Sequence, residues 1–345
     1  MGKIRMEFSL TAINVLMFIA LAIPGYIIMK VKLVKPSAIA YFAAVLLYVN
    51  QPFLSLYSFL KVEYSPQLLA NLGVAFLVSL ISQCVMFFVV WFILHKRYSL
   101  PNPCLSGKKW ADKNSFLQTN ADCYRNGGLR DRKGAALRVL TLSCTFGNVG
   151  FLGVPILYAL LPLAPEAIAY SAVYIVSMNL LCWTVGAAVL TGDKKYISLK
   201  KALLNPPTAT LIVALPLFFM GIKLPDIAMK GISFLAEMTT PMCMLILGMR
   251  FATAPMKQLF ENRGVWMASL TKIIIFPLAV FGVLYFLPID HILKVTMFIL
   301  AAMPSASVTL NLSEIYKADT NTAANAVLLS TLLCALTVPV LLLLA

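Results

Sequence analysis

Ten long apolar stretches occupy most of the sequence, and they restrict the fold more than any other feature. Most of them are about 20 residues or longer, the length that an α-helix needs to cross the hydrocarbon core of a bilayer. Only 12% of the 345 residues are charged, against about 25% in a typical soluble domain. The sequence therefore predicts an all-α polytopic membrane protein with ten transmembrane helices, at 8–29, 37–60, 66–94, 134–161, 166–191, 203–221, 226–249, 265–287, 291–313 and 320–344.

The basic residues alternate between the two sides of these segments. The connections 1–2, 3–4, 5–6, 7–8 and 9–10 carry 3, 9, 4, 3 and 1 Lys or Arg, 20 of the 28 in the chain. Cytoplasmic loops of membrane proteins carry such an excess. We therefore expect a multi-pass protein of the cell (plasma) membrane with both termini outside and a basic cytoplasmic loop at 95–133. The net charge of +15 then reports topology, and we expect no nucleic-acid partner.

Four segments contain helix-breaking residues near their middle. They are the second ("YVNQPFL"), the fourth ("TFGNVGFLGVP"), the seventh ("EMTTPMCM") and the ninth ("AAMPSASVTLN"). These positions correspond if the chain is two halves of five helices, and because five is odd the second half is inverted. The predicted organisation is helices 1–3 at 1–94, the loop 95–133, helices 4–5 at 134–191, and helices 6–10 at 203–345. Interrupted segments at matching positions of two halves indicate a transporter binding site.

An interruption at membrane depth is tolerated only where the backbone is buried in protein or lines a cavity. Each interruption also creates helix ends, whose free N–H groups suit anions. Glycine permits close approach of a chain or ligand, and an asparagine amide both donates and accepts hydrogen bonds. The predicted substrate-binding residues are Asn50, Gln51, Gly147, Asn148, Gly150, Thr240, Pro304, Ser305 and Ser307.

Three stretches resemble the auxin efflux carrier family, which includes PIN-like proteins and bacterial organic-acid permeases. "SCTFGNVGFLGVPIL" at 143–157 is similar to the fourth-helix signature of that family, and "LLNPPTATLI" at 203–212 to the start of its sixth helix. The run from 301 to 344 is similar to its ninth and tenth helices. The plant members have proline directly before the asparagine of the fourth helix, where this chain has Gly147.

The resemblance implies a five-plus-five inverted repeat with broken crossover helices 4 and 9 and elevator-type alternating access. It also implies that Asn148 is a ligand for a substrate carboxylate and that Pro304 is the crossover proline of helix 9. Because Gly147 departs from the plant pattern, we expect a carboxylate smaller than auxin, such as malate, malonate or lactate.

Charged residues inside the segments are candidates for coupling, since ionisable groups in a membrane are costly. Glu237 and Lys272 are the coupling candidates, Glu237 through protonation or cation binding. The alternative for Glu237 is a hydrogen bond between helices as a neutral acid. For Lys272 and Arg138 the alternative is that their side chains snorkel to the interface.

The leading prediction is a secondary active transporter of a small organic anion, driven by a proton, by sodium or by the membrane potential. Two alternatives stay open: a sodium-coupled carrier similar to the bile acid symporters, and a membrane sensor that signals through 95–133. The sequence shows no catalytic motif, so we expect no enzyme activity. We expect no cofactor or metal site, since Cys104 and Cys123 have no partner in a CxxC motif. The expected partners are the lipid bilayer and the organic anion, and a homodimer is left open.

Overall fold

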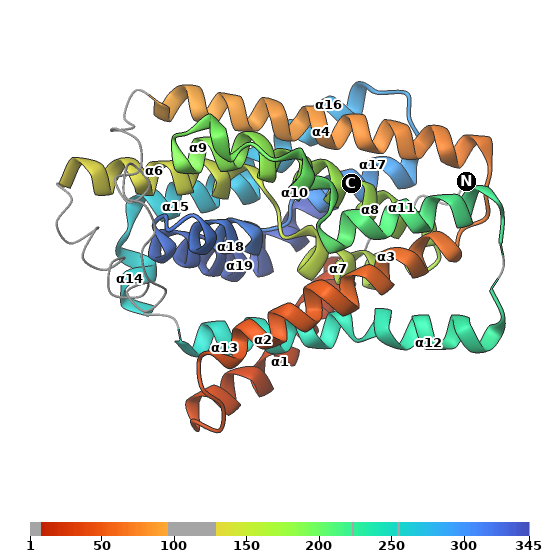
Figure 1. The fold of residues 1–345 in the computed structure, drawn as a ribbon, viewed down its shortest axis with the longest axis horizontal. Helices are drawn as coiled ribbons and strands as arrows, with labels where there is room; N and C mark the ends of the chain where they lie inside the picture. The colour runs from red at the N-terminus through yellow and green to blue at the C-terminus, as the bar shows by residue number, and fades with distance from the viewer. Residues whose placement is uncertain (1–7, 96–128, 223, 254–255, 345) are drawn as a thin grey trace.

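The computed structural model describes residues 8–95, 129–222, 224–253 and 256–344. Most of the predicted loop 95–133, with Cys104 and Cys123, lies outside this part of the chain. Within these residues all regular secondary-structure elements are helices, and the one β-type pairing is an isolated bridge. The prediction of an all-α protein is therefore confirmed (Figure 1).

Helices occupy each of the ten apolar segments. The first half contains α1 (Phe8–Lys30), α2 (Ala38–Val45), α3 (Gln51–Leu60), α4 (Pro66–Leu94), α6 (Leu129–Thr145), α7 (Val154–Leu160), α8 (Pro165–Leu181) and α9 (Ala187–Thr191). The second half contains α10 (Leu199–Leu203), α11 (Pro206–Phe219), α12 (Asp226–Glu237), α13 (Thr239–Thr253), α14 (Met256–Glu261), α15 (Arg263–Leu270), α16 (Phe276–Phe286), α17 (His291–Ala301), α18 (Ser307–Ile315) and α19 (Thr320–Leu341). Four π-helical turns join neighbouring helices: η1 (Leu46–Asn50), η4 (Val149–Gly153), η5 (Cys182–Gly186) and η7 (Thr271–Ile275).

Seven helical stretches in the described residues are long and apolar enough to cross a membrane. Shorter apolar helices lie at 134–145, 149–160 and 291–301, which belong to the fourth and ninth predicted segments. The protein is thus a multi-pass membrane protein, while the total of ten spans stays a prediction.

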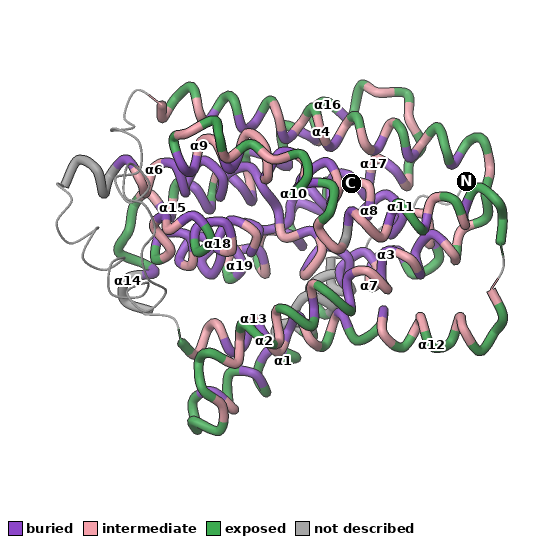
Figure 2. Tube along the Cα trace, in the orientation of Figure 1, coloured by how far each residue is buried: buried purple, intermediate pink, exposed green. Residues whose placement is uncertain are grey.

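The surface is apolar where a bilayer would cover it. Phe88 and Phe92 on α4 and Phe286 on α16 are more than half exposed, whereas a water-soluble protein rarely exposes large contiguous apolar patches. Burial is concentrated in α6, α8, α17, α18 and α19, and the outer faces of α4 and α12 are largely exposed (Figure 2).

The helices pack in two groups. In one, α1 packs against α13, and α3 packs against α11 and α12. In the other, α4 packs against α8, and α15 and α18 pack against α19. Figure 1 shows α1, α2, α12 and α13 together along one side of the molecule and α4, α6 and α15 along the other. The groups meet where α1 contacts α19 and where α3 contacts α8.

Two of the four predicted interruptions are wrong. In the second segment the helical backbone runs from 38 to 60, and the Gln51 N–H reaches five residues back to the Leu46 carbonyl, which closes η1. This π-turn accommodates Pro52 near the start of α3 without unwinding the chain. In the seventh segment only Met238 separates α12 from α13, and its backbone keeps helical dihedral angles.

Candidate functional site

The fourth and ninth segments are interrupted as the sequence predicts. Residues 146–148 separate α6 from η4, and residues 302–306 separate α17 from α18. The two interruptions contact each other, because Gly147 and Ser305 form an isolated antiparallel bridge. We call these two stretches the junction.

Backbone hydrogen bonds join the two strands of the junction in both directions. The Asn148 N–H donates to the Pro304 carbonyl at 2.7 Å, and the Ala306 N–H donates to the Phe146 carbonyl at 2.8 Å. An unsatisfied backbone group costs several kcal/mol at membrane depth. Each interruption therefore supplies the hydrogen-bond partners that allow the other to be non-helical.

Ser305 holds the junction in place. Its hydroxyl donates to the Ser143 carbonyl at 2.8 Å, and its N–H donates to the Ser330 hydroxyl at 3.0 Å. The side chain is fully buried and lines none of the cavities described below. In this conformation the hydroxyl has a structural partner, so it does not face a ligand.

A cavity of about 200 Å³ lies beside the junction, and we call it the junction cavity. Its wall includes five of the predicted binding residues: Gln51, Gly147, Asn148, Gly150 and Ser307. Ser307 is the first residue of α18, so the N-terminus of that helix borders the cavity. None of the described residues that line it is charged. The site therefore offers amide, hydroxyl and backbone groups in an otherwise apolar pocket.

Two buried amides, Asn50 at the end of η1 and Gln51 at the start of α3, lack hydrogen-bond partners, and of the two only Gln51 lines the junction cavity. Both amide atoms of Asn50 and the Nε2 of Gln51 have no partner among the described residues, although both side chains are at least nine-tenths buried. Gln51 presses against Gly150, because a Cβ on that glycine would lie 2.6 Å from Gln51 Nε2. Buried polar groups normally have partners, so Gln51 in the cavity wall has unused capacity for a ligand.

Lys272 lies directly behind the junction. Its side chain is fully buried, and Nζ donates to the Ala301 carbonyl at 2.7 Å, at the C-terminal end of α17. A Cβ on Gly147 would lie 3.3 Å from Lys272 Nζ. The alternative that Lys272 snorkels to the interface is therefore wrong, because η7 directs its side chain inward. An ammonium at a helix C-terminus is stabilised by the carbonyl ends of the helix.

The sequence was compared with protein-family models and with known proteins. Residues 194–342 match the family model described as membrane transport protein. This part of the chain is similar to the membrane transport protein family. The chain is also 30% identical over 211 residues to an uncharacterized transporter of Methanocaldococcus jannaschii, and the match covers 59% of this chain and 66% of that relative. The match to the family includes the stretches at 203–212 and 301–342, and the resemblance based on them is confirmed. The motif at 143–157 lies outside the matched range.

The remaining predicted residues lie away from the junction cavity. Glu237 is exposed at the C-terminal end of α12, and Thr240 is half-buried in the first turn of α13. Pro304 contributes its carbonyl to the junction and does not line the cavity. Arg138 is buried in α6 and does not snorkel as an exposed side chain. In this chain the placements separate groups that build the junction from groups that line the junction cavity.

Several polar residues of the cavity wall were not predicted from the sequence. Asn179 donates from Nδ2 to Asn205 Oδ1 at 3.2 Å, and both line the junction cavity together with Trp183 and Asn311. Asn205 belongs to the stretch that resembles the family, yet it was not assigned to a site. An asparagine inside an apolar segment, such as Asn179, was the sequence signal that could have identified these residues.

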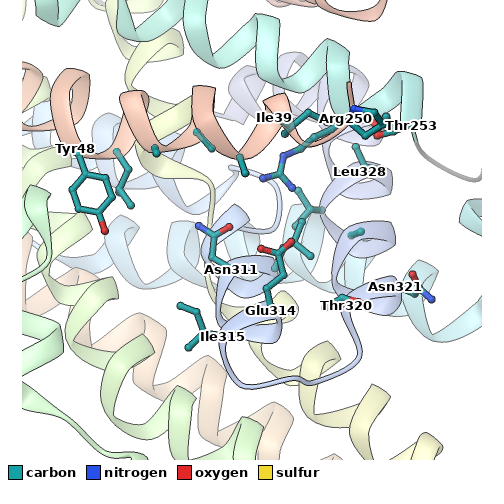
Figure 3. Close-up of a pocket in the computed structure, with 18 residues that line it drawn as sticks. Ile39, Tyr48, Arg250, Thr253, Asn311, Glu314, Ile315, Thr320, Asn321 and Leu328 are labelled. Carbon is teal, nitrogen blue, oxygen red and sulfur yellow. The ribbon is translucent and has the colours of Figure 1, made fainter. Parts of the chain in front are cut away.

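A second and wider cavity of about 610 Å³ adjoins the first, and we call it the wide cavity. The two cavities share Leu47, Tyr48, Asn311 and Ile315 in their walls. Arg250 enters the wide cavity from α13, while Asn311 and Glu314 enter from α18 (Figure 3). The charge pattern of the sequence places Arg250 in a connection between segments, but α13 continues to Thr253.

Proposed function

We propose that this protein is a secondary active transporter of a small organic carboxylate and that the substrate binds in the junction cavity. The observation that carries the proposal is the pair of interrupted helices, joined by mutual backbone hydrogen bonds beside a cavity lined by Asn148. The cavity volume of about 200 Å³ is smaller than the roughly 300–1,000 Å³ of pockets for drug-sized ligands. A small organic acid therefore fits better than a large amphipathic anion.

The groups around the cavity suit a carboxylate. Asn148 offers an amide donor, Ser307 a hydroxyl, and α18 the N–H groups of its first turn. Helix N-termini favour anions through these free N–H groups. Lys272 places a buried amine on the other side of Gly147. In its protonated form this amine would neutralise part of the negative charge of a bound carboxylate.

Alternating access follows from the two groups of helices in this proposal. The group containing α3, α11, α12 and α13 would act as the scaffold, and the group containing the junction, α8 and α19 would move the substrate. The mutual hydrogen bonds keep both strands of the junction in the same moving body. We propose ten helices in a five-plus-five inverted repeat, both termini outside the cell, and an elevator-type movement in the plasma membrane.

The proposal also includes residues that couple substrate transport to a driving ion. Glu237 is exposed in this conformation, so a coupling role requires that the movement bring it against the other group of helices. Lys272 is the stronger coupling candidate, because it contacts the junction directly. Sodium coupling is the competing arrangement, with freed carbonyls and the amides of Asn50 and Gln51 as ligands.

A ligand screen by thermal unfolding tests the proposal. The purified protein is titrated with malonate, malate and lactate at two pH values, with sodium or with choline as the only cation. A bound ligand raises the unfolding temperature by mass action. We expect stabilisation by at least one carboxylate that persists in choline, followed by saturable uptake of that carboxylate into proteoliposomes. Stabilisation that requires sodium would favour the sodium-coupled carrier, and the absence of any carboxylate effect on unfolding or uptake would refute the proposal.

A further inference from the structure

We infer that Arg250 forms a second anion subsite in the wide cavity, where a small organic carboxylate binds before it reaches the junction. The inference rests on the proposed transport of carboxylates. It adds a residue, a location and a step that the junction cavity does not contain.

Arg250 is a basic residue in the walls of two cavities. Of the described residues that line the wide cavity, only Arg250 and Glu314 are charged. Among the described residues, no other lysine or arginine lines the wide cavity, the junction cavity or the small cavity described next. Its guanidinium is half-buried and points into open space between α13 and α18 (Figure 3). Within the described ranges, no carboxylate lies within ion-pair distance of Arg250.

A small cavity of about 20 Å³ connects Arg250 with the junction. Arg250 lies in its wall together with Asn148 and Ser307, which also line the junction cavity. One arginine therefore borders both the wide cavity and the space next to the proposed binding asparagine. A carboxylate released by Arg250 has a short path to Asn148.

The chemistry of Arg250 fits a carboxylate. A guanidinium binds a carboxylate through two parallel hydrogen bonds, and it keeps its charge at any physiological pH. None of the described residues that line the junction cavity is charged, and Lys272 lies buried behind it, whereas a charged group that lines an open cavity raises the local concentration of counter-ions. Arg250 thus governs capture of the substrate, and the junction governs its transfer.

In this inference Glu314 competes with the entering carboxylate for the guanidinium of Arg250. It is exposed on α18, on the wall that faces Arg250, and the two side chains point toward each other (Figure 3). Its negative charge partly neutralises the guanidinium. An entering carboxylate must displace that interaction, so Glu314 limits the affinity of the subsite.

The side of the membrane on which the wide cavity lies allows a test of the inference. The wide cavity is bordered by Pro36, Thr253 and Thr320, which lie next to the basic connections that the charge pattern places in the cytoplasm. Uptake of labelled malonate and lactate is measured over a range of concentrations in inside-out and in right-side-out membrane vesicles. The variants are Arg250→Gln, Arg250→Lys and Glu314→Gln. Arg263→Gln is the matched control, because Arg263 is an exposed arginine on the same side and outside the cavities.

In inside-out vesicles we expect Arg250→Gln to raise KM by about tenfold, which corresponds to about 1.4 kcal/mol, with the maximal rate unchanged. Arg250→Lys should raise KM less, since it keeps the charge and loses the forked geometry. Glu314→Gln should lower KM. Arg263→Gln should leave KM at the wild-type value, and right-side-out vesicles should show smaller changes for all variants.

An unchanged KM for Arg250→Gln, or an equal rise for Arg263→Gln, would overturn the inference while leaving the proposed function intact. If Arg250→Gln does not fold, an unchanged KM in both Arg250→Lys and Glu314→Gln would overturn it equally. Wild-type vesicles that take up no carboxylate above vesicles lacking the protein would refute the proposed function itself.

Discussion

Removal of the charge behind the junction should weaken substrate binding without unfolding the protein. Lys272→Met keeps the length of the side chain and removes the ammonium that donates to the Ala301 carbonyl at 2.7 Å. Replacing a buried ionic group by an apolar one of similar volume is often neutral for stability, because the lost interaction is offset by the removed desolvation penalty. We therefore expect a small change in unfolding temperature.

The effect on binding can be worked from the structure. A Cβ on Gly147 would lie 3.3 Å from Lys272 Nζ, and one further van der Waals contact of about 3.5–4 Å places a bound carboxylate roughly 7 Å from the ammonium. At an effective dielectric constant of about 20, unit charges at that distance attract by about 2.4 kcal/mol. This energy corresponds to about a 50-fold loss of affinity.

The assay is a titration of the purified variant with the carboxylate that stabilises the wild type, followed by thermal unfolding. Lys272→Arg restores the charge and should recover part of the affinity. Lys230→Met is the control, because Lys230 is an exposed lysine on α12. Wild-type affinity in a folded Lys272→Met variant would refute the assignment of Lys272 as the counter-charge of the substrate.

Two glycine substitutions give further tests. Gly150→Ala should reduce affinity in the same titration, because its Cβ would lie 2.6 Å from Gln51 Nε2 and displace that amide in the cavity wall. Gly282→Ala, where nothing lies within 4 Å of a Cβ, should leave affinity unchanged, and equal effects of both would contradict the role of Gln51. Gly248→Ala should lower the unfolding temperature without a specific effect on affinity, since its Cβ would meet the Ala22 backbone carbonyl where α13 packs on α1. An unchanged unfolding temperature would show that this helix pair separates easily.

The sequence predicted the junction because local chemistry and membrane physics act there together. Three glycines, an asparagine and a proline interrupt an apolar run in "TFGNVGFLGVP", and a matching interruption surrounds Pro304. Non-helical backbone in a bilayer needs a partner, and the two stretches are each other's partner. The same reasoning failed at Pro52, because one π-turn relocates the hydrogen bonds around a proline without exposing any backbone. Composition alone does not distinguish these two outcomes.

Side-chain direction was the part that the sequence could not supply. Lys272 points from η7 to the end of α17, where its Nζ donates to the Ala301 carbonyl, and its position in the segment gave no sign of this. Arg250 was counted among the loop charges because its helix continues several residues past the apolar run. The cavity wall also combines Asn179 from α8 with Asn205, which caps α11. Such contacts depend on the packing of helices that are distant in the sequence.

The most direct test of the central claim is carboxylate uptake by the Asn148→Ala variant in proteoliposomes, compared with the wild type at equal amounts of folded protein. Asn148 keeps its backbone hydrogen bond to Pro304 in this variant and loses only the amide that faces the junction cavity. The account predicts that saturable uptake is abolished while the unfolding temperature without ligand is retained. Uptake by Asn148→Ala with the KM and maximal rate of the wild type would contradict the claim that the substrate binds at the junction.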